Sequence, residues 1–564
     1  MESLTETAWD VLIAGTGLQQ SLLALALSRS GKKVLHVDRN RYYGGDDAAF
    51  SLQEAEDWVT EVGQARLPTF KEASISREES TSSTEQVKGI PSLSFSRAYS
   101  LSLSPELIYT RSKLLPLLVS SKSSRQLEFL AVGSWWVYDV GQSADESADH
   151  GTVRQRGRLQ KVPNGREDVF SDESIDLRSK RALMKFLKFV GSFEDYEEEW
   201  LSFASKPFPE FLTSKFKLPA ALQKPLLALT LSPDVPNKTT TAFAIPRIAR
   251  HLRSIGVFGP GFGAVLAKWG GGAEIAQVAC RAGAVGGGVY VLDQGVKHVS
   301  SAVSETAHSS DEPKSDKRQR VDIQLDGGDT VSSQWVVGSA SDIASHGAPA
   351  VSDAESSVEY STVARSITIV SASLSSLFPV TAEGAPSPAG AVVAFPTGSL
   401  QGRAEQEEQP PVYILVHSSD TGECPSGQCI LYASTLDCPD AHALLDEAVS
   451  YLVDSSSDET APPQILYSLR YKQQGPESSS THSVSDLSSL PVSALQTDSD
   501  RPAKVYLFSP PSLDLAFDDR ILDAVKQVWK NIIGEEVDES SFMVFEERNG
   551  MGEDGEDGRD VDEE

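Results

Sequence analysis

Residues 10–38 read DVLIAGTGLQQSLLALALSRSGKKVLHVD, and this stretch decides the fold. Residues 10–14 form a short apolar run typical of a buried strand, and a glycine turn follows it. Residues 18–30 are rich in Leu and Ala, which favours a helix that ends at Gly31. Residues 33–37, KVLHV, are typical of a second strand. The order strand, turn, helix and strand predicts a βαβ unit, so we expect an α/β fold with a parallel sheet.

The turn after the first strand carries two of the three glycines of a dinucleotide-binding fingerprint. That fingerprint, G-x-G-x-x-G, brings a pyrophosphate to a helix N-terminus. Gly15 and Gly17 occupy the first two positions, but Gln20 stands at the third, where its side chain adds bulk. Asp38 ends the second strand, where an acidic residue would bind a ribose hydroxyl. The pattern favours a degenerate dinucleotide turn, retained as a scaffold, over a working cofactor site.

The composition is that of a globular protein of 564 residues, which is long enough for two or more domains. With 50 basic and 80 acidic residues the net charge is −30, which disfavours nucleic acids and anionic membranes as main partners. We expect no membrane-spanning helix, no secretory signal and no presequence. Four cysteines suggest a reducing compartment. Cys424, Cys429 and Cys438 lie near His442 without a CxxC pair, so we expect no metal site.

The rest of the chain alternates helical, strand-like and polar segments. Residues 178–190 carry apolar side chains at helical spacing and basic ones on another face, which predicts an amphipathic helix. Further helices are expected at residues 208–215, 220–231, 241–255, 441–453 and 519–533, and strands at 289–292, 335–338, 366–372, 413–417, 430–434 and 505–508. Polar composition predicts loops at residues 74–100, 141–155, 304–319, 381–388 and 478–500. Residues 546–564, with ten acidic residues and two arginines, predict a disordered tail.

Three stretches resemble one protein family, in the same order along the chain. Residues 31–45, GKKVLHVDRNRYYGG, with residues 10–20, closely resemble the first signature region of the Rab GDP-dissociation inhibitor and Rab escort protein superfamily. The middle region of the family is resembled by residues 127–138 and 157–170 together with residues 178–190, RSKRALMKFLKFV. Its later region is resembled by residues 269–292, WGGGAEIAQVACRAGAVGGGVYVL. The resemblance is good over the N-terminal 300 residues and loose beyond them. It implies a flavoprotein-like, Rossmann-type large domain with several sheets, an inserted small α-helical domain and a vestigial FAD-type site without cofactor.

The resemblance also implies how the chain is divided. The large domain would comprise residues 1–170 and 258–545, with the helical domain at 171–257 and the acidic tail at 546–564. The length of the chain, its polar insertions and the segment GRLQKVPNGREDVF at 157–170 resemble the escort branch more than the inhibitor branch.

Escort proteins bind newly made, GDP-bound Rab GTPases, present them to geranylgeranyltransferase type II and chaperone the prenylated product to membranes. The resemblance therefore implies a non-catalytic, cytoplasmic accessory protein that contacts membranes transiently. Its implied partners are Rab GTPases, the α and β subunits of the transferase and geranylgeranyl lipid. A Rab GDP-dissociation inhibitor, which extracts and recycles prenylated Rabs, is the first alternative, and a flavin oxidoreductase is the second.

The resemblance further implies a Rab-binding platform. In the family it uses the second Tyr of a YYGG motif and a Glu and an Arg seven residues apart, which match Tyr43, Glu274 and Arg281. Residues just after a later double glycine also take part, and Val289 and Val291 stand there. One residue is inserted before Glu274, so we expect an altered backbone at that point. The alternatives are that Tyr43 only caps the sheet and that Glu274 and Arg281 form a solvated ion pair.

Two apolar sites complete the expectations from the resemblance. In the family the helical domain contacts the transferase and takes up prenyl groups, which makes Phe186 and Phe189 candidates for transferase or lipid contact. The favoured alternative is that both are core residues of a helical bundle. For the C-terminal tail of the Rab, the nearest candidates are residues 114–119 and 127–129.

Overall fold

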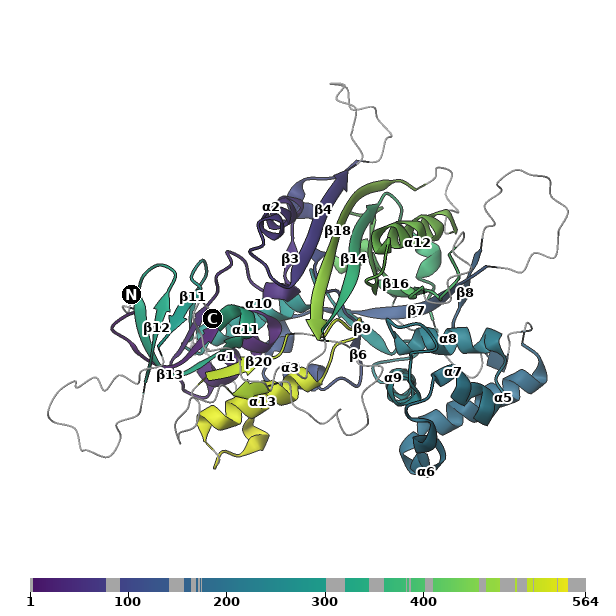
Figure 1. Cartoon of the computed structure of the whole chain (residues 1–564), viewed down its shortest axis with the longest axis horizontal. Helices are drawn as coiled ribbons and strands as arrows, with labels where there is room; N and C mark the ends of the chain where they lie inside the picture. The colour runs from purple at the N-terminus through teal and green to yellow at the C-terminus, as the bar shows by residue number, and fades with distance from the viewer. Residues whose placement is uncertain are drawn as a thin grey trace, which may run out of the picture.

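The computed structural model describes residues 4–77, 92–140, 157–163, 169–170, 173, 175–300, 320–343, 360–381, 383–384, 387–400, 409–455, 463–476, 492–494, 505–510, 512–534 and 536–545. Within these residues the strands form an eight-stranded sheet, a ten-stranded sheet and a two-stranded pair. In Figure 1 the first sheet lies at the left near the N-terminus, the second lies above the centre, and a group of helices lies at the lower right.

The eight-stranded sheet is built around the N-terminal βαβ unit. β1 (Ala8–Ala14) pairs in parallel with β2 (Val34–Val37) on one side and with β13 (Thr330–Ser339) on the other. The strand order is β10-β2-β1-β13-β12-β11, and β20 pairs with β13 and β19. The other strands are β10 (Val289–Val291), β11 (Val296–Val299), β12 (Val321–Leu325), β19 (Val492–Ala494) and β20 (Val505–Phe508). The predicted parallel βαβ unit is confirmed.

Helices cover one face of this sheet. α1 (Leu18–Arg29) lies between α10 (Gly272–Val285) and α13 (Arg520–Ile533), and α3 (Leu114–Ser120) packs against the same apolar cluster. The Leu and Ala side chains of α1 let this helix pack closely on both neighbours. Burial of each Leu side chain contributes about 1.5–3 kcal/mol to the stability of the fold. On the opposite face, apolar side chains of β12 and α11 (Ala340–Ile343) pack with those of the central strands in a second, smaller apolar cluster.

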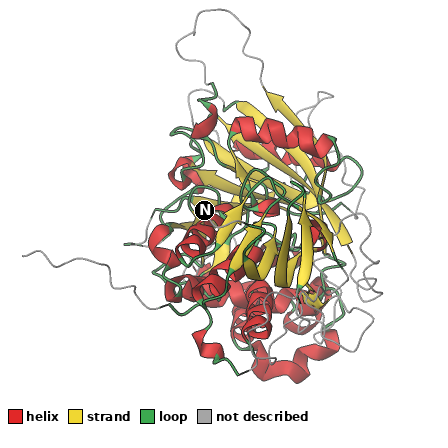
Figure 2. Ribbon diagram, turned by 90° about the vertical axis from the view of Figure 1, so that its left-hand side faces the viewer, coloured by secondary structure: helices red, strands yellow, loops and turns green. Residues whose placement is uncertain are grey.

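The ten-stranded sheet has the order β4-β18-β14-β17-β16-β15-β7-β9-β6, with β8 paired to β7. Its strands are β4 (Phe70–Arg77), β6 (Ile108–Tyr109), β7 (Phe129–Asp139), β8 (Arg158–Lys161), β9 (Ala264–Ala267), β14 (Tyr360–Val370), β15 (Gly390–Phe395), β16 (Val412–Ser418), β17 (Cys429–Leu436) and β18 (Ile465–Pro476). α12 (Ala441–Ser455) covers one face, and α2 (Leu52–Gly63) packs beside β4. Figure 2 shows the strands in the middle of the molecule, with helices above and below them.

The remaining helices follow β8 along the chain. They are α5 (Leu177–Gly191), α6 (Glu197–Trp200), α7 (Phe208–Phe211), the π-helical turn η6 (Leu212–Phe216), α8 (Ala220–Thr230) and α9 (Thr241–Ser254). Asp176 caps α5 by accepting hydrogen bonds from the backbone N–H groups of Arg178 and Ser179. These helices fall within residues 171–257, and their apolar side chains join the cluster under the ten-stranded sheet. The domain boundaries stay a prediction.

Short elements complete the described chain. The two-stranded pair is β3 (Ala49–Phe50) with β5 (Leu101–Ser102). The 3₁₀ turns are η1 (Gly45–Asp47), η2 (Ser96–Ala98), η3 (Ser123–Gln126), η4 (Phe193–Tyr196), η5 (Leu201–Phe203), η8 (Ser375–Leu377), η9 (Ser419–Thr421) and η11 (Glu539–Ser541).

Two of the predicted loops contain strands. β4 occupies the start of the loop predicted at 74–100, because its outward side chains are polar and its pairing partner β18 lies far along the sequence. β19 lies inside the loop predicted at 478–500 and pairs with β20. The segments 141–155 and 304–319 and the acidic tail at 546–564 lie outside the described residues.

Candidate functional site

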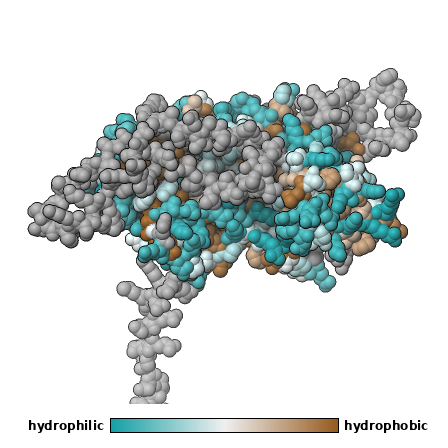
Figure 3. All heavy atoms as spheres, turned by 60° about the horizontal axis from the view of Figure 1, so that its bottom comes forward, coloured by the Kyte–Doolittle hydropathy of each residue, from teal (hydrophilic) through white to brown (hydrophobic). Residues whose placement is uncertain are grey.

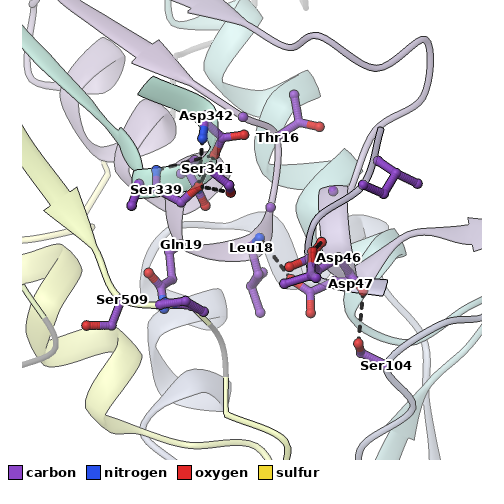
Figure 4. Close-up of a pocket in the computed structure, with 18 of the residues that line it drawn as sticks. Thr16, Leu18, Gln19, Asp46, Asp47, Ser104, Ser339, Ser341, Asp342 and Ser509 are labelled. Atoms are coloured by element: carbon purple, nitrogen blue, oxygen red, sulfur yellow. Dashed lines mark hydrogen bonds between the residues drawn. The ribbon is translucent and has the colours of Figure 1, made fainter. Parts of the chain in front are cut away.

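A cavity of about 360 Å³ lies beside the glycine turn between β1 and α1. Its walls include the turn itself, Asp38 at the end of β2, the turn η1 and Asp342 after β13. Figure 4 shows Asp46 and Asp47 facing the start of α1 from one side, with Ser339 and Asp342 on the other. In a dinucleotide-binding fold the pyrophosphate lies at this helix N-terminus.

Carboxylates of the chain accept the hydrogen bonds that this turn donates. Asp38 Oδ2 accepts from the backbone N–H of Thr16 at 2.7 Å and from its hydroxyl at 2.6 Å. Asp47 Oδ2 accepts from the backbone N–H of Leu18, the first residue of α1, at 3.2 Å. The donors that would face a phosphate therefore already bind acidic side chains.

Two further side chains cover the glycines of the turn. The Asp342 carboxylate packs directly against Gly15 and leaves no room for a Cβ there. Gln20 folds over Gly17, so that a Cβ on Gly17 would lie 3.0 Å from the Gln20 Oε1 atom, and its amide donates to Asp342 Oδ2 at 3.4 Å. Because phosphates and carboxylates repel each other, the residues present do not fit a dinucleotide. Gln20 thus blocks the second glycine, as well as replacing the third.

Burial dominates the electrostatics of these carboxylates. It raises the pKa of Asp38 to about 6, with a further contribution from the Asp342 carboxylate. It raises the pKa of Asp46 to about 7, with Asp47 as the next cause, although the Thr69 hydroxyl opposes the shift. Burial also raises the pKa of Asp47 to about 6, while the hydrogen bond from Leu18 opposes it. The acidic cluster therefore titrates just below neutral pH.

The YYGG loop connects β2 to η1 and is tied to the glycine turn. The backbone N–H of Gly44 donates to Thr16 Oγ1 at 3.0 Å. Gly44 has φ 104°, and a Cβ there would lie 2.9 Å from Cα of Ala48, so the loop requires glycine at this position. Tyr42 turns inward and meets Phe50 edge-on, with 4.8 Å between ring centroids. The loop therefore has one tyrosine in the core, and the next tyrosine is free for another role.

Tyr43 is half-buried on the side of the loop that faces α10. Burial raises the pKa of its hydroxyl, and Cys280 of α10 and Asp38 raise it further. The phenol is therefore uncharged throughout the physiological range. Tyr43 presents a rigid aromatic ring and one polar atom next to α10, and this kind of side chain anchors protein interfaces.

α10 carries Glu274 in its first turn and Arg281 two turns later, so both lie on one face. Arg281 Nη2 donates to Glu274 Oε1 at 2.7 Å, and the two side chains are 54% and 16% exposed. An ion pair this exposed contributes little to stability, so the pair fits both a solvated surface and an interface. The inserted residue lies before the helix, where Trp269, Gly270 and Gly271 all have positive φ, and it leaves Glu274 in the first turn.

β10 places its two valines and its tyrosine on opposite faces of the sheet. Val289 and Val291 are registered with Leu35 and Val37, and they pack with the cluster on the face away from α10. Tyr290 instead packs against Gly283 of α10, 5.0 Å from the His36 ring, and its electrostatic neighbours include Cys280 and Tyr43.

The structure therefore divides the platform inferred from the sequence between the two faces of β10, and the role of each residue in Rab binding stays a prediction. Tyr43, Tyr290, Glu274 and Arg281 lie around α10, and we call this set the Tyr43–α10 surface. Val289 and Val291 face the other way. The sequence contained the signal, because side chains alternate between faces along a strand and Tyr290 stands between the two valines.

The comparison with known families decides the assignment. The family model described as GDP dissociation inhibitor matches residues 5–312, which is more than half of the chain. The chain belongs to the GDP dissociation inhibitor family. The solved structure of Rab GDI from Plasmodium falciparum has a TM-score of 0.58 at 19% identity, covering 93% of this chain and 98% of that chain. The flavoprotein-like α/β fold implied by the resemblance is thus confirmed.

Relatives of this family member carry names from Rab prenylation. Rab proteins geranylgeranyltransferase component A of Saccharomyces cerevisiae is 34% identical over 290 residues, 50% of this chain and 43% of that protein. The protein of the same name in Candida albicans is 28% identical over 437 residues, 78% of this chain and 60% of that protein. Rab escort protein 1 of Arabidopsis thaliana is 28% identical over 322 residues, 51% of this chain and 54% of that protein. The chain spans about half the length of these relatives.

In this member of the family, Phe186 and Phe189 lie in the core. Phe186 is 0% and Phe189 7% exposed, and their rings pack against Phe208, Phe211 and Phe216. Neither is presented for contact with the transferase, because the apolar face of the amphipathic helix α5 is the face that packs inward. The exposed face of α5 carries Arg178, Arg181, Lys185 and Lys188.

Residues 114–119 and 127–129, the candidate binding segments for the C-terminal tail of a Rab, are also largely buried. Leu114, Leu115 and Leu118 of α3 are buried, as is Leu127, whereas Val119 is exposed. The backbone N–H of Phe545 donates to Ser120 O at 3.2 Å, which brings exposed Val544 beside this end of α3. Arg29 lies over the Phe545 ring and against Gly286, next to exposed Val285.

Three exposed valines, Val119, Val285 and Val544, are thus sequence neighbours of residues that contact one another here, and we call them the valine patch. Figure 3 shows apolar side chains in several separate groups on the face that it presents.

Two further predictions concern a metal site near the cysteines and a membrane-spanning helix. Among the described residues, no group of three or more His, Cys, Asp or Glu side chains is arranged to bind a metal ion. Cys424 and Cys429 are buried, and their thiols donate to the backbone carbonyls of Gln428 and Ser373. No helix within the described ranges has the length and apolar character needed to cross a bilayer.

Proposed function

We propose that this protein is a Rab escort protein. It binds newly synthesised, GDP-bound Rab GTPases, presents them to geranylgeranyltransferase type II and chaperones the prenylated product to membranes. The observation that carries the proposal is the Tyr43–α10 surface, where two segments matching separate signature regions come together. Relatives named geranylgeranyltransferase component A or Rab escort protein support the same function.

The Tyr43–α10 surface has the composition of a protein interface. Tyr43 offers an aromatic ring, and Arg281 offers a planar, permanently charged donor that is more than half exposed. In the unbound protein, Glu274 holds the Arg281 guanidinium in place by accepting its hydrogen bond, and a bound partner would supply a further acceptor for it. Binding a Rab here exchanges an exposed ion pair for a desolvated one, and the energy of the contact would depend on how completely water is excluded.

The chemistry proposed is presentation and not bond formation. With the globular part of the Rab bound, its C-terminal cysteines are tethered near the transferase, which raises their effective concentration at the active site. The transferase α and β subunits provide the catalysis. After transfer, apolar surface shields the geranylgeranyl groups, at about 0.8 kcal/mol for each CH₂ removed from water. The valine patch is the part of the described surface that we assign to the Rab tail.

We further propose that the chain binds no flavin and has no redox activity. The support is the glycine turn, whose donors bind Asp38 and Asp47 and whose glycines are covered by Asp342 and Gln20. A cytoplasmic location with transient membrane contact follows from the same proposal, because the Rab and its transferase meet before membrane delivery.

A reconstituted prenylation assay tests the proposal. The full chain would be mixed with the transferase subunits, a geranylgeranyl donor and an unprenylated, GDP-bound Rab. Lipid transfer that requires this chain supports the escort function. If the chain fails to support transfer but extracts prenylated Rab from membranes, it is a GDP-dissociation inhibitor. A stoichiometric flavin spectrum in the purified protein would instead establish an oxidoreductase.

A further inference from the structure

The start of α1 has an electrostatic requirement that its own sequence does not meet. Its N-cap is Gly17, which has no side chain, and its first turn contains no acidic residue. The first N–H groups of any helix lack intrahelical partners and carry roughly half a positive charge. In cofactor-binding proteins of this architecture an anionic pyrophosphate meets that requirement. A protein without the cofactor needs another anion in the same place.

Asp47 supplies a carboxylate at that position. It closes η1, directly after the YYGG motif, and its Oδ2 atom accepts from the backbone N–H of Leu18 at 3.2 Å. Gly45, which starts η1, has φ 52°, a conformation that favours glycine, and a Cβ on it would lie in van der Waals contact with the Gly17 nitrogen, at 3.4 Å. Figure 4 shows this carboxylate beside Leu18.

The same aspartate also lies at the start of α10. A Cβ on Gly272, the first residue of α10, would lie 3.6 Å from the Asp47 Cβ atom. α10 likewise begins after a glycine, Gly271, with no side-chain cap. α1 and α10 pack side by side, and Asp47 lies against the first residue of each while accepting a hydrogen bond from α1.

A second tie fixes the other end of the loop. Asp38 Oδ2 accepts from the Thr16 hydroxyl at 2.6 Å, and Thr16 Oγ1 in turn accepts from the Gly44 backbone N–H at 3.0 Å. In the sequence, Tyr43 stands between Asp38 and Gly44, the two residues that this tie joins through Thr16. Its position relative to α10 is therefore set by contacts with the former cofactor turn.

We propose that the Asp47 carboxylate is an internal replacement for the cofactor phosphate, and that it positions Tyr43 and α10 as one binding surface. Asp47 is a positioning residue, because it lies beneath the surface and acts through Tyr43, Glu274 and Arg281. The effect on Rab binding rests on the proposed function, whereas the anion replacement does not.

The test compares wild type, Asp47→Ala and Asp47→Asn in the full chain. Asp47→Ala is expected to weaken binding of a GDP-bound Rab roughly tenfold, as for loss of an interface hot spot. Asp47→Asn retains the shape without the charge and is expected to lie between Asp47→Ala and wild type. Asp293→Ala is the matched control, since Asp293 is an exposed aspartate of the neighbouring loop, paired with Arg41.

Anion rescue separates positioning from simple destabilisation. Sodium acetate, which replaces only the lost carboxylate, is expected to raise the melting temperature of Asp47→Ala and to restore its Rab binding, compared with sodium chloride at equal ionic strength. Wild type and Asp293→Ala are expected not to respond to acetate.

The outcomes distinguish the two proposals. Wild-type binding by Asp47→Ala, or a loss of binding and stability that acetate does not restore, would overturn the role of Asp47. If wild type binds no Rab, the escort proposal fails, while anion rescue of the melting temperature still supports the replacement.

Discussion

α1 and α10 lie side by side and both begin next to Asp47, yet they face different surroundings. Every residue of α1 except Arg29 is buried. α10 buries Ile275, Val278 and Cys280 but exposes one face that carries the Glu274–Arg281 pair. In a cofactor-binding protein, α1 would act through its N-terminus. Here that N-terminus meets an internal anion, so the surface that a partner can reach belongs to the neighbouring helix.

The largest effect expected from this contrast is on folding. Leu22 of α1 is fully buried, so Leu22→Ala should lower the free energy of unfolding by about 2–5 kcal/mol. Arg281→Ala on α10 should change it by about 0.5 kcal/mol or less. Denaturant titration of both variants measures this, and equal losses would contradict the division of roles between the two helices.

The buried carboxylates should make stability depend on pH. Burial raises the pKa of Asp46 from 3.8 to about 7, so the folded state binds this proton more tightly than the unfolded state. Its stabilising effect is present at low pH and is lost as the pH rises from about 4 to about 7. Asp46→Asn, which can still accept from Thr69, should therefore stabilise the protein at pH 8 by on the order of 1–3 kcal/mol.

Thermal melting of wild type and Asp46→Asn between pH 4 and pH 8 measures this effect, which is a property of the turn alone. The melting temperatures of the two proteins should converge toward pH 4 and separate progressively up to about pH 7. Parallel pH profiles would show that Asp46 does not carry a raised pKa.

For the Tyr43–α10 surface, the comparison predicts that substitutions weaken Rab binding without lowering stability. Tyr43→Ala and Arg281→Ala should each weaken binding of a GDP-bound Rab roughly tenfold, about 1.4 kcal/mol, with unchanged melting temperatures. Val289→Thr is the matched control, because Val289 lies on the opposite face of the sheet. Equal weakening by Val289→Thr would show that the two faces have been assigned wrongly.

The smallest expected effect concerns the ion pair itself. Glu274→Gln removes the negative charge that faces Arg281 but keeps an acceptor oxygen, and Arg281 is exposed, so the free energy of unfolding should change by about 0.5 kcal/mol or less. Thermal melting of Glu274→Gln at low and high salt would measure this change. A loss of stability as large as that expected for Leu22→Ala would place the pair in the core.

The sequence predicts local features well and tertiary links poorly. The βαβ unit, the strand β20 and the helix α13 follow from apolar periodicity, which is a local property. The helical spacing of Phe186 and Phe189 already favoured a core position for both. The link between Leu18 and Asp47 joins residues that are distant in the sequence, and no periodicity indicates it. β4 was missed because a partly exposed edge strand resembles a polar loop in composition.

The most direct test is a calorimetric titration of the purified full chain with an unprenylated, GDP-bound Rab and, separately, with FAD. The account predicts stoichiometric binding of the Rab, weakened in Tyr43→Ala, and no heat of binding from FAD. Stoichiometric binding of FAD, with no binding of the Rab, would contradict it.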